Sequence, residues 1–358
     1  MIDWRCSWGC GIVTALALHL GMAAASPTYA QPTSCEPVVA SRNEGVTIDR
    51  SGHYCLRQDV WIDDPSPLAW HGTGRPHVTV DIVHDDVDLD LDGHTIHAGA
   101  ASPFVNIHAS VEDLRTSPPK PPPQRVVIRN GRIDSVTQGA VFSGFWTAAV
   151  LSDLGDPLEG MSVSGLPELQ LAQMIQYNQK LNAAMFDKEL RRRPASTSDY
   201  LPRQIRLENL KIQAHGGNGS TGARDGAINI QGAGTVIRNC TIETDAGTAI
   251  WIFGPKSLIE NNTIIVHGTN RQREADAPIR LIQGDGAVIR NNKFVFKDAA
   301  NRRVISTFST GPITVEDNTF YGLSNVDPIG QAFLGSLQMR ARGNRIEPAW
   351  KAVFAGGF

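Results

Sequence analysis

Val236-Ile237-Arg238-Asn239-Cys240-Thr241-Ile242, Leu258-Ile259-Glu260-Asn261-Asn262-Thr263-Ile264 and Val288-Ile289-Arg290-Asn291-Asn292-Lys293-Phe294 are three copies of one pattern. The pattern runs apolar, charged, Asn, small or Asn, polar, apolar. Because an internal repeat indicates an architecture of stacked units, these stretches decide the fold. Further copies lie at Ile128–Ile133, Leu207–Ile212, Val315–Phe320 and, in degenerate form, Ala341–Ile346.

The repeat has a variable period, which is typical of a solenoid whose units bury their faces only against their neighbours. Each apolar anchor stands next to a charged residue, and this alternation predicts a strand with one buried face. The successive separations are 30, 22, 30, 26 and 26 residues, counted between Asn209, Asn239, Asn261, Asn291, Asp317 and Gly343.

The Asn pair predicts a corner between two strands. We expect its first residue to stack a side-chain amide on the next coil. We expect its second residue to adopt the left-handed backbone that Gly and Asn tolerate. That second position is held by Gly131, Asn262, Asn292, Asn318 and Asn344.

Another strand precedes each of the three central copies and ends in Gly: Ala227–Gly232, Ala249–Gly254 and Ile279–Gly284. In each case the last Ile of this strand lies seven residues before the anchor Ile of the Asn pattern. One unit is therefore a strand, a Gly turn, a strand, the Asn corner, a short third strand and a connection of variable length. This order describes one coil of a parallel β-helix.

On these repeats the chain resembles the right-handed parallel β-helix of the pectin lyase-like superfamily. The resemblance covers about residues 78–350, apart from an insertion. It implies an all-β solenoid, and it implies a carbohydrate-related role, since that superfamily contains polysaccharide lyases, hydrolases, uronate epimerases and non-catalytic surface proteins. Function resides in sites placed on a fold, and no known catalytic residue set of that superfamily matches this sequence.

The ends and the insertion give the expected domain organisation. Residues 1–30 resemble a secretory signal, with basic Arg5, an apolar run and a small-x-small site before Gln31. Residues 31–77 are expected to cap the helix, residues 78–350 to form it, and residues 351–358 to be a tail. A helical insertion is expected at about residues 143–203.

Export would place the chain in a periplasmic or extracellular, oxidising compartment. There Cys35 and Cys55 are expected to form a disulfide, and Cys240 to be a buried free thiol. The net charge of −3 predicts no bulk attraction to nucleic acid or to an anionic membrane. We expect a monomer without a membrane span after signal removal.

Candidate site residues lie in the loops before the Gly-ended strands. Asp225, Asp245 and Asp276 each lie five to seven residues before the last Ile of their strand, on successive coils. Coils stack about 4.8 Å apart, so these carboxylates would have separations that suit a glycosidase pair or a shared calcium ion. The alternative, that they only solvate turns, is equally open, and no other cofactor is indicated.

Trp251 alternates with buried Ile250 and Ile252, so its indole is expected to face outward as a platform for a sugar ring; burial under a loop is the alternative. Asn229 and Arg280 belong to the neighbouring strands. The sequence leaves open whether Arg280 faces inward or outward; facing outward, it could neutralise a uronate or take a proton. The remaining candidates are polar loop residues for acid–base chemistry or for holding an acidic chain: His215, His267, Arg224, Arg271 and Arg273.

The Asp88-x-Asp90-x-Asp92 run also contains three acids, but they alternate with apolar residues along a strand and end at the Asp92-Gly93 corner. We therefore expect a structural role for them.

Three functions remain open. The first is a lyase or epimerase acting on an acidic, uronate-containing polysaccharide, which needs a charge neutraliser and a base. The second is a non-catalytic protein for polysaccharide binding or exopolysaccharide assembly. The third is a glycoside hydrolase using paired Asp residues.

Overall fold

The computed structural model describes fourteen stretches of the chain. The expected signal peptide, and the expected helical insertion from residue 144 on, lie outside them. None of the described helices is long and apolar enough to cross a membrane. The described residues are 34–40, 45–62, 80–98, 105–107, 123–135, 140–143, 204–214, 226–245, 248–267, 277–282, 284–297, 304–308, 311–323 and 339–354.

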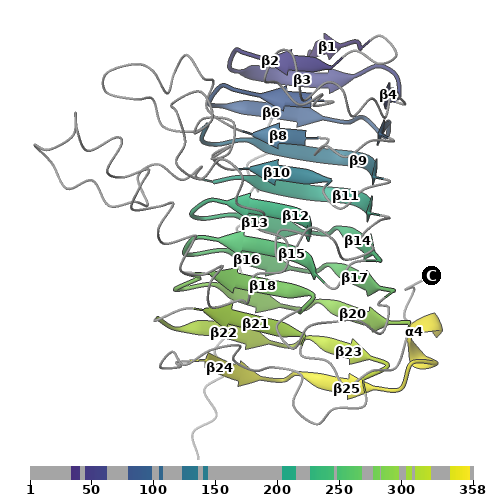
Figure 1. Cartoon of the computed structure of the whole chain (residues 1–358), viewed down its shortest axis with the longest axis vertical. Coiled ribbons are helices and arrows are strands. Elements are labelled where there is room, and N and C mark those ends of the chain that lie inside the picture. Colours follow the sequence, from purple (N-terminus) through teal and green to yellow (C-terminus); the bar gives the residue numbers. More distant parts are fainter. Residues whose placement is uncertain are drawn as a thin grey trace, which may run out of the picture. The chain divides into compact units, whose positions relative to one another are not determined.

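Residues 34–358 form a compact unit in which parallel strands stack in three rows (Figure 1). The first row is a sheet of its own, with eight described strands. They are, in order, β2 (Val46–Ile48), β5 (Val80–Ile82), β8 (Val105–Ile107), β10 (Val141–Ser143), β12 (Gly226–Gln231), β15 (Thr248–Phe253), β18 (Ile279–Ile282) and β21 (Ile305–Phe308).

The second and third rows are joined at the Asn corners, which the long strands β9 (Val127–Ser135) and β11 (Arg206–Ala214) cross without a break. The second row also contains β1 (Glu36–Val38), β3 (Gly52–Leu56), β6 (Val87–Asp90), β13 (Val236–Arg238), β16 (Leu258–Glu260), β19 (Val288–Arg290), β22 (Ile313–Glu316) and β24 (Met339–Arg342). The third row also contains β4 (Val60–Ile62), β7 (Thr95–Ala98), β14 (Thr241–Thr244), β17 (Thr263–Val266), β20 (Lys293–Phe296), β23 (Thr319–Tyr321) and β25 (Arg345–Glu347).

Each coil passes through the three rows in turn, as the repeat predicts, and the all-β parallel architecture is confirmed. The strands of one row pair in register, so equivalent residues stack in columns; Ile237, Ile259, Ile289 and Val315 form one such column. Every member of it is fully buried. Because each coil buries its apolar residues only against the next, the core is a continuous stack of Ile, Val, Leu and Phe.

The roles predicted for the Asn pair are reversed in the structure. The first residue is the left-handed one, with φ of 57° at Asn261 and 55° at Asn291, and both side chains are exposed. The second residue forms the amide ladder: Asn262 donates from its backbone N and from Nδ2 to Oδ1 of Asn292, at 3.0 Å in both cases. Asn292 makes the same two bonds to Asn318 at 2.9 Å.

The physical reason for the reversal is that a left-handed corner turns its own side chain to solvent and the following side chain into the coil. The buried amides then satisfy backbone groups that no strand pairs. Asn292 Nδ2, for example, also donates to the Ile259 carbonyl at 2.9 Å. Gly131 is likewise not left-handed; Asn130 is, with φ of 59°, and a side chain at residue 131 would collide with Leu91.

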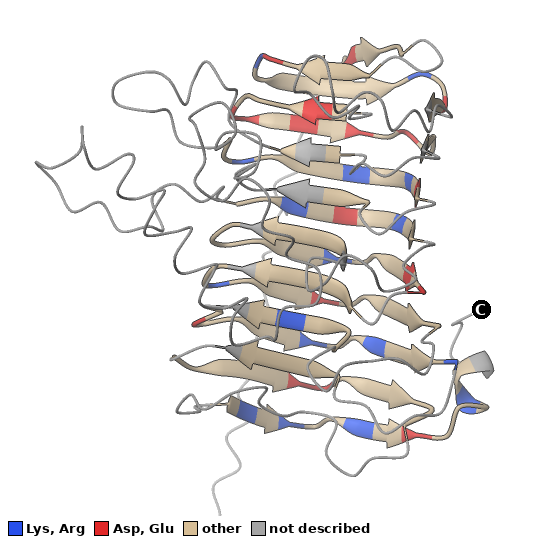
Figure 2. Cartoon of the chain, viewed as in Figure 1, with Lys and Arg blue, Asp and Glu red and all other residues tan. Residues whose placement is uncertain are grey.

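Outside the core, the charged residue of the repeat forms a column of alternating sign. Register pairs Glu208 with Arg238, Arg238 with Glu260, Glu260 with Arg290, and so on to Arg342. Arg290 Nε lies 2.8 Å from Glu260 Oε2. Acidic and basic segments on successive strands are visible in Figure 2. Opposite charges on adjacent strands stabilise this register and disfavour alternatives that would place like charges together.

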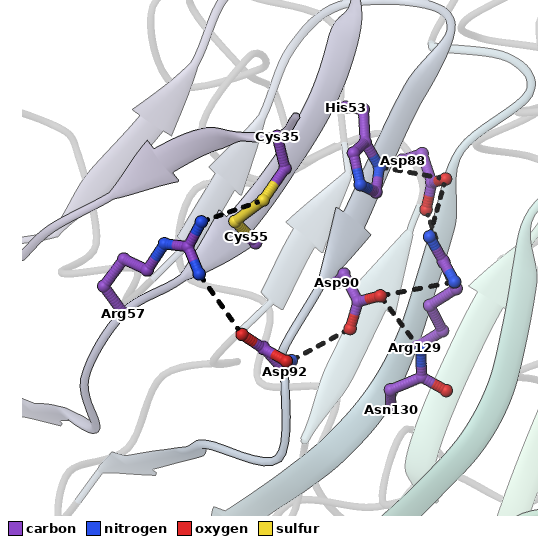
Figure 3. Close-up of a disulfide and its surroundings, with 9 residues drawn as sticks. All are labelled: Cys35, His53, Cys55, Arg57, Asp88, Asp90, Asp92, Arg129 and Asn130. Atoms are coloured by element: carbon purple, nitrogen blue, oxygen red, sulfur yellow. Dashed lines mark hydrogen bonds and ion pairs between the residues drawn. A yellow bond between two sulfur atoms is a disulfide. The ribbon is translucent and has the colours of Figure 1, made fainter. Parts of the chain in front are cut away.

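The first strands follow the same plan. The described part of the expected cap region, residues 31–77, carries β1–β4, and these strands pair in parallel with one another or with β5, β6 and β7. Cys35 and Cys55 form the expected disulfide (Figure 3). Cys240 is a buried free thiol, as predicted.

The Asp88-x-Asp90-x-Asp92 run is engaged in structural contacts (Figure 3). Arg129 Nε donates to Asp88 Oδ1 at 2.9 Å, and Arg129 lies 3.2 Å from Asp90. Asp90 Oδ1 accepts from the backbone N of Asp92 at 2.9 Å, where Asp92 and Gly93 turn the corner with φ of 48° and 82°. The hydrogen bond to Asp88 raises the pKa of Arg129.

At the other end, the described structure closes with the short helix α4 (Lys351–Phe354), in the segment expected as a tail. Ala352 of α4 is fully buried against Ile265, Val295 and Tyr321, which lie on the outer side of the third row. This part of the row is therefore apolar and covered.

Candidate functional site

The predicted site face is a single column on the outer side of the first row. Register pairs Asn229 with Trp251, Trp251 with Arg280, and Arg280 with Ser306. Their strand neighbours point into the core, which fixes all four as outward. The structure thus brings the predicted trio together on β12, β15 and β18, and it settles the orientation of Arg280.

The column continues to Ser306 on β21, which the sequence analysis missed. The signal was available, because Ile305-Ser306-Thr307 occupies the same place one coil further on. An amide, an indole, a guanidinium and a hydroxyl group therefore stand on four successive strands.

The column is buried, so of the two alternatives open for Trp251 the structure shows burial and not an open platform. Trp251 is 3% exposed, and the other three side chains are 3–5% exposed. The alternation correctly gives the direction of the side chain, but exposure depends on what lies above the sheet, which a strand pattern does not contain. One buried hydrogen-bond donor is unsatisfied: among the described residues, no atom accepts a hydrogen bond from Trp251 Nε1.

Two of the predicted acid–base candidates lie at the start of the connections that lead from the third row to the first. Asp245 follows β14, and its backbone N donates to the Ala214 carbonyl at 3.2 Å. His267 follows β17 one coil later, in the matching position. Asp245 is exposed and His267 is half-buried. Neither residue belongs to the column of Trp251 and Arg280.

His267 is held by a carboxylate. Its Nε2 lies 2.6 Å from Glu243 Oε1, and Gln213 Nε2 donates to the other oxygen, Oε2, at 2.9 Å. Both oxygens of Glu243 thus have partners on neighbouring strands. This arrangement crosslinks three coils of the third row and accounts for His267 without a ligand.

The remaining candidates lie outside the described residues. Within the described part of the chain, no group of three or more His, Cys, Asp or Glu side chains is arranged to hold a metal ion. The described residues therefore contain no ligand set for the calcium ion that the sequence suggested. Of the three acids proposed to bind it, only Asp245 is among the described residues. The candidates outside are Asp225, Asp276, His215, Arg224, Arg271 and Arg273.

Comparison with known proteins agrees with the fold. Residues 203–348 match the family model described as a right handed beta helix region. This protein is a right-handed parallel β-helix. No curated protein matches its sequence. Among solved structures, the chain is similar to the Streptococcus pneumoniae surface protein and adhesin PfbA, with 10% identity over 87% of this chain and 88% of that one. The TM-score is 0.22, which is too low to carry any inference.

Proposed function

We propose that this β-helix is an exported carbohydrate-active protein that recognises an acidic, uronate-containing glycan at the column of Asn229, Trp251, Arg280 and Ser306. The observation that carries the proposal is the register of Arg280 with Trp251 on the neighbouring strand, together with the buried Trp251 indole N–H, which has no acceptor among the described residues. The Cys35–Cys55 disulfide supports export, because disulfides persist in oxidising compartments.

The chemistry of the column suits a uronate. A guanidinium presents its N–H donors in a planar fork that matches a carboxylate. The Trp251 indole offers an N–H for a ligand oxygen, and leaving such a buried donor unpaired costs about 1–3 kcal/mol. Asn229 and Ser306 add an amide and a hydroxyl on either side, as the few polar groups of a sugar site require.

The burial of the column also indicates the form of the ligand. Side chains that are 3–5% exposed cannot carry the middle of a long polysaccharide as an open groove would. We therefore propose that the column takes a chain end or a short oligosaccharide. When affinities are expressed per mole of glycan chain, short uronate oligosaccharides should bind more tightly than the polymer.

The reaction class proposed first is that of a lyase or an epimerase, in which Arg280 neutralises the uronate carboxylate while a base removes the neighbouring proton. The base would have to come from Asp225, Asp276 or His215. Hydrolysis with paired Asp residues would need two carboxylates at a defined separation. The column itself supplies none on its described strands.

Non-catalytic binding or assembly of polysaccharide is the second candidate. It is favoured by the engagement of His267, one of the acid–base candidates, with Glu243. In this case the column would hold a uronate without changing it.

A screen against uronate-containing oligosaccharides, with and without calcium, separates these candidates. New unsaturated ends would identify a lyase, a changed uronate configuration an epimerase, and new reducing ends alone a hydrolase. Saturable binding without any product would identify a binding protein. If no uronate glycan binds or reacts, the proposed function is refuted.

A further inference from the structure

A groove near the N-terminal end of the solenoid is independent of the buried column. It has a volume of ≈ 740 Å³, within the range of about 300–1,000 Å³ usual for small-molecule sites. It lies beside the third-row strand β4, with residues contributed from before β4 and from the corner before β7. Its lining residues are Ala40, Arg57, Gln58, Asp59, Trp61 and His94.

Trp61 is the aromatic wall of this groove. Val60 is buried on the inner side of β4, so Trp61 faces outward, and it is 43% exposed. One face of its indole stacks on the His97 ring, with centroids 3.7 Å apart and planes inclined by 13°. Because His97 Nδ1 also lies 3.6 Å from Asp134 Oδ2, the stack is anchored on the next two coils. The indole is thus held in one orientation and still open to a ligand.

Polar groups surround the indole. Asp59 Oδ1 accepts from the backbone N of Thr95 at 2.8 Å and lies 3.3 Å from His94 Nδ1, which fixes the carboxylate. No described residue donates to its second oxygen, Oδ2, which could accept from a ligand hydroxyl. Among the described residues, Arg57 contacts Asp92 and the Cys35 sulfur, both at 3.4 Å, and its side chain is 52% exposed (Figure 3).

Gln58 completes the set of hydrogen-bonding groups. Its Nε2 donates to the Ala40 carbonyl at 2.9 Å, which orients the amide. The charges of Arg57 and Asp59 balance, so the lining has no net charge when the His94 ring is neutral. This balance contrasts with the single guanidinium of the buried column.

From this geometry we infer a second carbohydrate site in the groove, one that takes a neutral sugar ring. The apolar face of the ring stacks on Trp61, and its hydroxyl groups exchange hydrogen bonds with Asp59, Arg57 and Gln58. A flat apolar face edged by groups that both donate and accept is the chemistry of a neutral pyranose ring. A uronate carboxylate would be attracted by Arg57 and repelled by Asp59, so the lining as a whole does not favour it. This inference does not rest on the proposed function of the buried column.

The test is binding of neutral hexasaccharides (cello-, malto-, manno- and xylo-series) and of a galacturonate hexasaccharide to the full chain, measured by calorimetry. We expect at least one neutral series to bind. Trp61→Ala should weaken its binding about 5- to 150-fold, which corresponds to about 1–3 kcal/mol for one stacking contact, by analogy with base–aromatic stacking. Asp59→Asn should also weaken it, and Trp61→Phe should restore most of the loss.

Trp350→Ala is the matched control, because Trp350 is a 62% exposed tryptophan after the last strand, β25, remote in sequence from the groove lining. It should bind like the parent. The inference is overturned if no neutral hexasaccharide binds, if Trp61→Ala binds the neutral sugar as tightly as Trp350→Ala does, or if the galacturonate alone binds in a Trp61-dependent way. If Trp61→Ala does not fold, Trp61→Phe and Asp59→Asn decide between these outcomes.

Discussion

Replacing Asn292 by Ala tests the amide ladder, the feature that most directly ties the repeat to the stability of the coil. Asn292 is fully buried, and its Oδ1 accepts from the backbone N of Asn262 at 3.0 Å. Ala would leave that N–H buried without its partner, at a cost of about 1–3 kcal/mol. Loss of the bond from Nδ2 to the Ile259 carbonyl adds about 1–2 kcal/mol. We expect the free energy of unfolding to fall by about 2–5 kcal/mol.

Asn291→Gly is the matched control, one residue away in the same corner. Asn291 is exposed and has φ of 55°, a conformation that Gly adopts without strain. We therefore expect this variant to change the free energy of unfolding by less than about 1 kcal/mol. Asn291→Ala should cost about 1–2 kcal/mol, because its side chain is placed in the left-handed region without the local hydrogen bonds open to Asn.

Urea unfolding followed by far-ultraviolet circular dichroism measures the stability of the three variants, with the unfolding midpoints compared at a common slope. Hydrogen exchange of the Asn262 amide gives a local readout, and only Asn292→Ala should speed it. The reasoning is refuted if Asn291→Gly destabilises the chain more than Asn292→Ala does, since that order would follow from the reversed assignment of the corner.

Three further outcomes follow from the structure. Glu260→Lys should lower the free energy of unfolding by about 0.5–2 kcal/mol more than Glu260→Gln, because the lysine places three adjacent cations at residues 238, 260 and 290. Added salt should reduce this difference between the two variants, and equal effects of the two variants would argue against the charge column. Reducing Cys35–Cys55, which are 20 residues apart, should cost about 3 kcal/mol and lower the thermal midpoint, whereas an unchanged midpoint would contradict this. Burial raises the pKa of the Cys240 thiol to about 12, so its stabilising contribution is complete below the unfolded pKa and is lost as the pH rises toward 12; at pH 9 it should react with iodoacetamide only after unfolding, and rapid native labelling would count against its burial.

The stacking of coils could be predicted from the sequence because the repeat specifies each strand, each turn and their order. The two Asn roles could not be separated in the same way, since both positions hold Asn in two of the copies. A signal was present, however: the second position also holds Leu210 and Cys240, which are apolar and buried, whereas the first holds Asp317 and Gly343. Apolar substitutes indicate the inward-facing position.

The candidate site was predictable in direction and not in exposure. Spacing placed Asn229, Trp251 and Arg280 at matching positions on successive strands, and alternation gave the outward direction of Trp251, because register within a row is set by the core residues on either side of each. The outward direction of Arg280 was left open by the sequence. Burial of Trp251 depends on contacts above the sheet. The groove at Trp61 escaped notice for a related reason: its lining comes from residues 40 to 94, and only the stacking of coils brings them together.

Binding of a galacturonate trisaccharide to Arg280→Gln, compared with Arg345→Gln, tests the central proposal most directly. Arg345 is an exposed arginine on β25, so its replacement removes the same charge away from the column. We expect Arg280→Gln to weaken binding at least tenfold, which corresponds to about 1.4 kcal/mol, while Arg345→Gln binds like the parent. Arg280→Gln should still unfold in a cooperative transition, which shows that the variant is folded. Equal affinities of the two variants for a ligand that the parent binds would contradict the placement of the site at this column.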